Sequence, residues 1–212
     1  MLEILSLPSG PLSTNAYLLA DPASGEAAVI DPAWDGAGLA DAAAGSGWTL
    51  LQVWYTHAHF DHFAGAAGLA EALGRQDLPV ALHFADLELW QSGGEGRGLG
   101  YDTPPGPTPS IDLAVTRELR LGGLTFQVRH TPGHTPGSCI FHCAAAGVLF
   151  SGDLIFQAGV GRTDLPGGDW DALVESILRE VFSLPEGTRI LPGHGPETRV
   201  GLEMRTNPWV RA

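Results

Sequence analysis

The 212-residue sequence predicts an α/β protein in which two β-sheets pack face to face and helices cover their outer sides. Two observations support this fold class. In each half of the chain strand patterns come first and a helix pattern follows, and hydrophobic residues make up 44% of the chain against 17% charged residues. That composition can bury a sizeable core, and the length suits a single domain over residues 1–212.

The first half combines short apolar strands with alanine-rich helices. A turn at Asp21–Gly25 separates two of the strands, and the unbroken apolar run before Thr56 is typical of a buried strand. The expected strands are Leu2–Leu7, Asn15–Leu19, Ala27–Ile30 and Leu50–Tyr55, and the expected helices are Ala37–Ala44 and Phe63–Leu73.

The second half contains the other strands and a helix. Gly122-Gly123 is a hairpin signal, and Asp169 is a suitable N-cap for the helix that follows it. The expected strands are Leu113–Leu121, Leu124–Arg129, Ser138–Cys143, Val148–Phe150 and Thr188–Leu191, and the expected helix is Trp170–Phe182.

One long loop separates the halves. Ser92–Ser110 contains six glycines and four prolines, and long loops in compact domains are usually functional or mobile. Trp90 and Tyr101 are its aromatic candidates for substrate contact. The alternative is a surface insertion with ordinary packed aromatic residues.

Charge and composition narrow the possible functions. The formal charge of −13 disfavours nucleic acid as a partner, because nucleic-acid binders need basic groups on phosphates. There is no lysine, so Schiff-base and P-loop lysine chemistry are excluded. Cys139 and Cys143 are expected to be small core residues. No apolar run approaches the ~18 residues of a membrane span, and no signal peptide precedes the first strand. We therefore expect a soluble cytoplasmic protein without a membrane partner; its oligomeric state stays open.

The segment from His57 to His62 carries the strongest signal for chemistry. Its four metal-competent side chains, His57, His59, Asp61 and His62, lie directly after an apolar strand and before a helix. In extended backbone His57 and His59 project to the same side, so one ion can take both. Asp61 and His62 need a turn to point together, which suggests a second ion.

Three further ligand candidates lie at the ends of other expected strands. His134, Asp153 and His194 each follow a glycine, which lets the backbone approach a site closely. His83, His130 and His142 lack this setting and are expected to be packed or surface residues, although His130 could orient a ligand. Asp31 is the better candidate for a carboxylate that orients a ligand histidine, and a turn role at Asp31-Pro32 is equally open.

The segment His57–His62 resembles the H-x-H-x-D-H signature of the metallo-β-lactamase superfamily, and His134, Asp153 and His194 match its later motifs. The resemblance covers essentially the whole chain and implies a four-layer αβ/βα sandwich with two mixed sheets. The stretches Gly161–Asp169 and Arg205–Pro208 resemble the glyoxalase II-like branch, the hydroxyacylglutathione hydrolases, here without their C-terminal helical domain.

The resemblance also implies a binuclear site. One ion would take His57, His59 and His134, the other would take Asp61, His62 and His194, and Asp153 would bridge them. The ions are expected to be Zn, with Fe or Mn as alternatives, because availability decides among metals for such ligands. A well-known type of β-lactamase has Cys at the position of Asp153, which argues against lactam hydrolysis.

The expected reaction is cleavage of a hydroxyacyl thioester such as S-lactoylglutathione by a metal-bound hydroxide. Asp61 could also orient that hydroxide and so serve as the catalytic residue. A thiolate leaves readily, so no general acid is needed; an ester or lactone fits nearly as well. Arg162 is the candidate contact for an anionic substrate group, with a salt bridge to Asp164 as the alternative.

Three other functions compete with this prediction. A mononuclear iron persulfide dioxygenase of the same fold would use His57, His134 and Asp153 as ligands. A phosphodiesterase needs a basic face that the charge of −13 does not suggest. A non-enzymatic zinc module would need a closed site, which seven ligands with room for water do not form.

Overall fold

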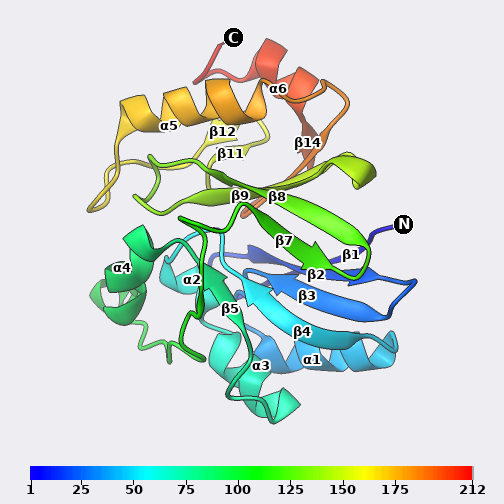
Figure 1. Cartoon of the computed structure of the whole chain (residues 1–212). Coiled ribbons are helices and arrows are strands. Elements are labelled where there is room, and N and C mark those ends of the chain that lie inside the picture. Colours follow the sequence, from blue (N-terminus) through cyan, green and yellow to red (C-terminus); the bar gives the residue numbers. More distant parts are fainter. Residues whose placement is uncertain (212) are drawn as a thin grey trace.

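We describe the fold from a computed structural model, which covers residues 1–211. Two six-stranded sheets face each other, and helices lie on their outer sides (Figure 1). The first sheet contains β1 (Glu3–Ser9), β2 (Thr14–Asp21), β3 (Glu26–Ile30), β4 (Thr49–Trp54), β5 (Val80–Leu82) and β6 (Ile111–Asp112). The second contains β7 (Glu118–Leu121), β8 (Leu124–His130), β9 (Cys139–Cys143), β10 (Val148–Gly152), β13 (Arg189–Pro192) and β14 (Thr198–Arg199).

The helices are short, and a small hairpin accompanies them. The α-helices are α1 (Gly36–Gly45), α2 (Phe60–Phe63), α3 (Ala66–Leu73), α4 (Leu87–Gln91), α5 (Trp170–Ser176) and α6 (Val200–Thr206). Strands β11 (Ile155–Phe156) and β12 (Gly159–Val160) pair with each other. The chain also forms 3₁₀ turns at Phe84–Asp86, Gly96–Leu99 and Ala144–Ala146, and a π-helical turn at Ile177–Val181.

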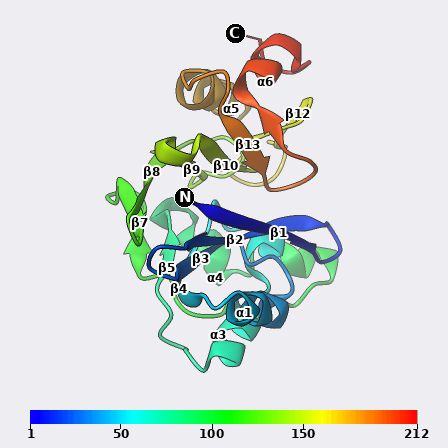
Figure 2. The ribbon, with the colours of Figure 1, turned by 90° about the vertical axis from the view of Figure 1, so that its right-hand side faces the viewer.

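Both sheets mix parallel and antiparallel pairs. The first has the order β1-β2-β3-β4-β5-β6 and becomes parallel from β3 onward. The second has the order β14-β13-β10-β9-β8-β7, in which only β10 and β13 are parallel. In Figure 2, α1 and α3 lie beyond one sheet and α5 and α6 beyond the other. The predicted fold class is confirmed.

Three apolar layers hold this arrangement together. Along β2, Leu18 packs toward α1 and α3, whereas Leu19 packs between the two sheets, as the two-residue period of a strand requires. Trp54 of β4 contacts Phe126 of β8 across the inter-sheet layer, with ring centroids 4.9 Å apart. A third layer lies between the second sheet and helices α5 and α6. Because the central strands are buried on both faces, their sequences are continuous apolar runs rather than alternating ones.

One predicted strand, Leu113–Leu121, is wrong in its first part. Residues 113–117 carry the chain from β6 in the first sheet to β7 in the second and form no strand of their own. Only their ends bond to a sheet: the N–H of Leu113 donates to the carbonyl of Leu82, and the carbonyl of Arg117 accepts from the N–H of Val128. The side chain of Asp112 accepts a hydrogen bond from the backbone N–H of Ala114 at 2.9 Å and so turns the chain at this point.

The expected helix Phe63–Leu73 begins earlier and is interrupted. Helix α2 starts at Phe60, and α3 starts after Gly65, whose backbone N–H donates to the carbonyl of Ala33 at 2.6 Å. The early start places Asp61 and His62 in a helical turn of their own. The helix expected at Trp170–Phe182 is present as α5 and the π-helical turn after it, and Asp169 caps it through the N–H of Ala172. Within residues 1–211, no helix has the length and apolar character needed to cross a bilayer.

Candidate metal centre

Seven predicted ligands gather where strands from both sheets end. The loop after β4 and helix α2 supply four of them, and the loops after β8, β10 and β13 supply one each. Their potential ligand atoms form three overlapping groups, each within 4.8 Å: His57 with His59 and His134, Asp61 with His62 and His194, and His57 with His62 and Asp153. The overlap means that two adjacent ions fit these groups.

Asp153 lies between two of these groups, the group of His57, His59 and His134 and the group of Asp61, His62 and His194. Its Oδ1 is 3.3 Å from Nε2 of His62, and its Oδ2 is 3.4 Å from Nε2 of His194 and 3.6 Å from Nε2 of His134. One carboxylate oxygen therefore faces histidines of both groups, and the other faces His62. This is the position that a bridging ligand requires.

A buried carboxylate, Asp31, orients two of the histidines. Its Oδ2 accepts from Nδ1 of His62 at 2.9 Å and from the hydroxyl of Thr56 at 2.7 Å. Because that hydroxyl donates to Asp31, it must accept from Nδ1 of His57, which lies 3.1 Å away. Both rings therefore carry their proton on Nδ1 and leave the Nε2 lone pair free for a metal. Asp31 stands at the position predicted for it, with a positive φ of 48° that is uncommon outside glycine.

Backbone carbonyls orient two further rings in the same way. Nδ1 of His134 donates to the carbonyl of Arg162 at 2.7 Å, and Nδ1 of His194 donates to the carbonyl of Leu12 at 3.2 Å. A carbonyl can only accept, so each ring carries a proton on Nδ1 and turns Nε2 into the cluster. There Nε2 of His134 lies 2.9 Å from Nδ1 of His59, and Nε2 of His194 lies 3.3 Å from Oδ2 of Asp61. Gly161 is required here, because a Cβ at this position would overlap the carbonyl oxygen of Asp153. The Gly161–Asp169 motif thus has a structural task beside His134.

Two positioning residues were not predicted. Thr14 donates its hydroxyl to Oδ2 of Asp61 at 2.6 Å. Asp86, fully buried, accepts from the N–H of Ala58 at 3.1 Å, the hydroxyl of Thr135 at 2.7 Å and the N–H of Gly137 at 2.6 Å. Asp86 therefore joins the loop of the first histidines to the loop of His134. The available sequence signal was a carboxylate shortly after the short apolar segment Val80–Leu82.

Several buried polar atoms of this cluster have no hydrogen-bond partner within residues 1–211, as expected for atoms that bind a metal. Among the described residues, four buried atoms of the cluster make no hydrogen bond of acceptable geometry: Nε2 of His57, His59 and His62, and Oδ1 of Asp153. A buried polar atom without a partner costs about 1–3 kcal/mol, so four in one place call for a ligand. Imidazole nitrogens and carboxylate oxygens together suit Zn, Fe or Mn. The residues present therefore fit a binuclear centre.

The pKa shifts differ between the histidines that lie beside other histidines and the histidine that lies beside carboxylates. Burial, together with the neighbouring imidazoles, holds the pKa of His57 well below its usual range and lowers that of His59 to about 3. Both rings therefore stay neutral, which is the form that binds a metal. At His194 burial lowers the pKa, but the hydrogen bonds that its ring donates to the carboxylates of Asp153 and Asp61 outweigh burial and raise the pKa to about 9. These carboxylates thus attract positive charge.

A cleft of about 700 Å³ opens above these ligands. His59, Asp61, His134, Asp153 and His194 reach its surface. Arg162 also lines it, but its guanidinium makes two hydrogen bonds to Asp164, at 2.7 and 2.8 Å. The salt bridge considered as the alternative role of Arg162 is thus present.

A family model described as the metallo-beta-lactamase superfamily matches residues 9–194 of the chain. The chain belongs to the metallo-beta-lactamase superfamily. Among its relatives, the "Probable metallo-hydrolase YqgX" of Bacillus subtilis is 36% identical over 210 residues, 96% of this chain and 95% of the relative. The "Hydroxyacylglutathione hydrolase GloC" of Haemophilus influenzae is 31% identical over 223 residues, 100% of this chain and 99% of the relative.

Solved structures agree with this membership. The BLEG-1 B3 metallo-beta-lactamase has a TM-score of 0.88 at 36% identity, and both chains are covered completely. TTHA1623 in a di-iron-bound form has a TM-score of 0.85 at 42% identity, over 97% of this chain and 100% of the other. ETHE1 from Myxococcus xanthus has a TM-score of 0.76 at 28% identity, over 97% and 83%. The predicted resemblance to the superfamily is confirmed.

Within this superfamily fold, the two predicted aromatic contacts lie outside the cleft lining. Tyr101 stacks on Phe60 with ring centroids 5.1 Å apart and also meets Trp34 edge to face. Phe60, rather than Tyr101, faces the cleft. Trp90 is only 5% exposed and belongs to the apolar layer beside α3, so the alternative of an ordinary packed aromatic holds for it.

The three histidines expected to be packed or surface residues, His83, His130 and His142, belong to none of the ligand groups. His83 and His130 stack on each other with ring centroids 4.1 Å apart, and His130 donates to the carbonyl of Pro136 at 2.8 Å rather than to a ligand side chain. His142 lies on β9, away from the ligand groups. Cys139 and Cys143 are free and buried, as predicted for core residues.

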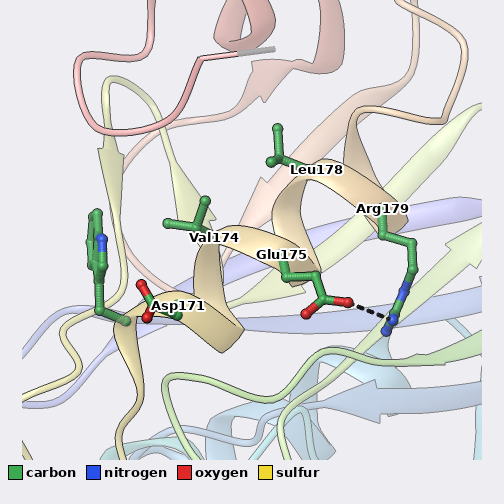
Figure 3. Close-up of a pocket in the computed structure, with 6 residues that line it drawn as sticks. Asp171, Val174, Glu175, Leu178 and Arg179 are labelled. Carbon is green, nitrogen blue, oxygen red and sulfur yellow. Dashed lines mark hydrogen bonds and ion pairs between the residues drawn. The ribbon is translucent and has the colours of Figure 1, made fainter.

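A second hollow lies on the outer face of the second half (Figure 3). It is formed by α5 and the π-helical turn after it, and its charged groups include Glu175 paired with Arg179 at 3.3 Å. It has no histidine and no orphaned buried atom. The metal-competent side chains of the described chain therefore gather at the cleft and not at this hollow.

Proposed function

We propose that the protein is a metal-dependent hydrolase of acyl thioesters, of the hydroxyacylglutathione hydrolase type. The observation that carries the proposal is the place of Asp153, whose carboxylate faces the histidines of both ligand groups. A bridging carboxylate favours two ions roughly 3.5–4 Å apart, the separation found in two-metal hydrolytic sites. The similarity to the hydroxyacylglutathione hydrolase of Haemophilus influenzae supports the same class of reaction.

His57, His59 and His134 would hold one ion, Asp61, His62 and His194 the other, and Asp153 would bridge them. A pair of divalent ions lowers the pKa of bound water from about 15.7 toward ~7 and stabilises negative charge that develops on a carbonyl oxygen.

The protein's own residues prepare that chemistry. Asp61 lies at the floor of the cleft, where the hydroxyl of Thr14 fixes its Oδ2 and leaves Oδ1 to orient an incoming water. Asp31 holds His57 and His62 in the correct tautomer before substrate arrives. No general acid is needed, since a thiolate is a good leaving group at neutral pH.

Metal quantification together with turnover of S-lactoylglutathione tests the proposal. Asp61→Asn should lower kcat/KM by at least about 100-fold, because loss of a partner of a ligand alone costs 10–100-fold. Asp171→Asn, an exposed carboxylate on α5, is the matched control and should change nothing. Full turnover by the metal-free protein or by the Asp61 variant would overturn the proposal. A β-lactam should be assayed alongside, given the similarity to a B3 metallo-beta-lactamase.

A second candidate function is the mononuclear iron persulfide dioxygenase. The similarity to ETHE1 from Myxococcus xanthus favours it. His57, His134 and Asp153 would then hold one iron, and the reaction would consume oxygen. One iron per chain with oxygen uptake on glutathione persulfide would support this function; two metals per chain without oxygen uptake would exclude it.

A further inference from the structure

The walls of the cleft above the ligands are mainly apolar. They are formed by Leu12, Phe60, Leu99, Phe156, Val160 and Leu165. Leu12 is 48% exposed and Leu99 is 66% exposed, so two leucines on separate loops present their side chains to solvent at the rim. Covering such side chains is favourable, at about 25 cal/mol for each Å² of apolar surface removed from water. The walls therefore favour a ligand with an apolar body.

Within residues 1–211 and outside the ligand cluster, only two charged side chains line the cleft, Arg162 and Glu95. Arg162 already has a carboxylate partner, because Asp164 takes both its Nε and its Nη2. The two hydrogen bonds from Arg162 lower the pKa of Asp164 to about 2, so the pair remains ionised and neutral overall. A substrate anion would have to displace Asp164 to use this arginine.

Glu95 is held at the cleft by its neighbours. The carbonyl of Gly94 accepts from the backbone N–H of Phe60 at 2.9 Å, and a Cβ at Gly94 would come within 2.5 Å of that nitrogen. A Cβ at Gly96 would come within 2.9 Å of the Phe60 ring. Between these two close contacts Glu95 adopts a left-handed φ of 67°, which an L-residue with a Cβ adopts at a cost of roughly 1–2 kcal/mol. Its side chain is exposed and lines the cleft.

Arg162, its partner Asp164 and Glu95 together give the walls one negative charge. The whole protein has a formal charge of −13 and no lysine. The hydroxyacyl group of the proposed substrates is small, so the cleft of about 700 Å³ must take mostly the thiol part of the thioester. Glutathione carries two carboxylates and one ammonium group, and the walls offer no free cation for either carboxylate.

We propose that the cleft selects thioesters whose thiol part is apolar and carries no negative charge. Glutathione thioesters are then accepted poorly, and Leu99, Leu165 and Glu95 are the residues that determine specificity. This inference rests on the proposed thioester hydrolysis, and it concerns which thioester is preferred.

A set of matched lactoyl thioesters tests the inference on the metal-loaded protein. The thiol parts are butanethiol, 4-mercaptobutanamide and 4-mercaptobutanoate, which separate apolar character from charge, with S-lactoylglutathione as the fourth substrate. We expect kcat/KM for the butyl thioester to exceed that for the butanoate by at least about tenfold, because transfer of a carboxylate from water to apolar walls without a partner is unfavourable. An equal or higher kcat/KM with the butanoate or with glutathione would overturn the inference and leave thioester hydrolysis standing.

Variants locate the effect. Leu99→Gln and Leu165→Gln should each lower kcat/KM for the butyl thioester by roughly threefold to tenfold and affect the butanoate less. Leu178→Gln is the control, since this leucine is likewise open to solvent, at 40% exposure, but lies on the outer face beyond α5. Glu95→Gln should raise kcat/KM for the butanoate relative to the butyl thioester, and high salt should shrink that gain.

Binding measured without turnover keeps the two proposals distinguishable. The corresponding thioethers cannot be hydrolysed, and calorimetry gives their Kd directly. The butyl thioether should bind at least about tenfold more tightly than the carboxypropyl thioether, which corresponds to a free-energy difference of ~1.4 kcal/mol. Equal Kd values would overturn the inference even if no thioester were hydrolysed. Absent turnover with this difference in Kd would overturn the proposed function instead.

Discussion

Asp31→Asn is the most informative single change in this protein. Asp31 accepts three hydrogen bonds, from the N–H and hydroxyl of Thr56 and from Nδ1 of His62. In its better orientation, asparagine keeps its oxygen toward the hydroxyl and His62 and turns its amide toward the N–H. One buried bond is then lost, at about 1–3 kcal/mol of the free energy of unfolding. Asparagine tolerates the positive φ at this position well, so backbone strain adds little.

The larger effect should appear in metal binding. His62 would face a neutral oxygen in place of a carboxylate, and such outer partners are worth about 10–100-fold in metal affinity. Competition with a chromogenic chelator measures the affinity of both ions. Asp35→Asn is the control, because this carboxylate lies on the same loop but only caps α1 through the N–H of Gly38. Unchanged affinity in the Asp31 variant would refute the view that this residue orients the ligands.

Three further predictions follow from the described contacts. Chelation of bound metal should lower the midpoint of thermal unfolding, and added zinc should restore it, because ions that bind only the native state stabilise it; a calorimetric scan that does not move would contradict the assignment. Gly161→Ala should lower the free energy of unfolding by at least about 1–3 kcal/mol, because its Cβ would overlap the carbonyl of Asp153. Denaturant titration measures this change, and a variant as stable as the parent protein would show that the loop relaxes freely. Cys139 and Cys143, buried with raised pKa values, should react with a thiol reagent only after unfolding; rapid labelling of the native protein would argue against their burial.

The convergence of the seven candidate ligands could be predicted because their signals are local. His57 and His59 alternate at the end of an apolar strand, and His134, Asp153 and His194 each follow a glycine at another strand end. The structure brings all seven side chains to one place. The layers could be predicted from strand and helix patterns, since strands buried on both faces give long apolar runs.

The contacts that support the ligands could not be predicted in the same way. Asp86 reaches partners 28, 49 and 51 residues away along the chain, and no sequence pattern encodes such pairs. Strands β11 and β12 have two residues each, too few for a periodic signal. The role of Asn207 in the Arg205–Pro208 motif emerges only in the structure: its amide donates to the carbonyl of Gly159 at 3.1 Å and so supports the hairpin beside the cleft.

The ligands come from loops of both sheets, and each sheet has its own outer apolar layer. Bound ions would therefore add to the contacts that join the two sheets, which include the backbone hydrogen bonds from Asn15 to Gly193 and from Cys139 to Thr56. By thermodynamic linkage, contact between the sheets and affinity for the ions strengthen each other by the same free energy. A substitution that loosens the contact of Trp54 with Phe126, remote from any ligand, should therefore also lower the affinity for the ions. In a metal-poor environment such a variant would lose its cofactor before it lost its fold.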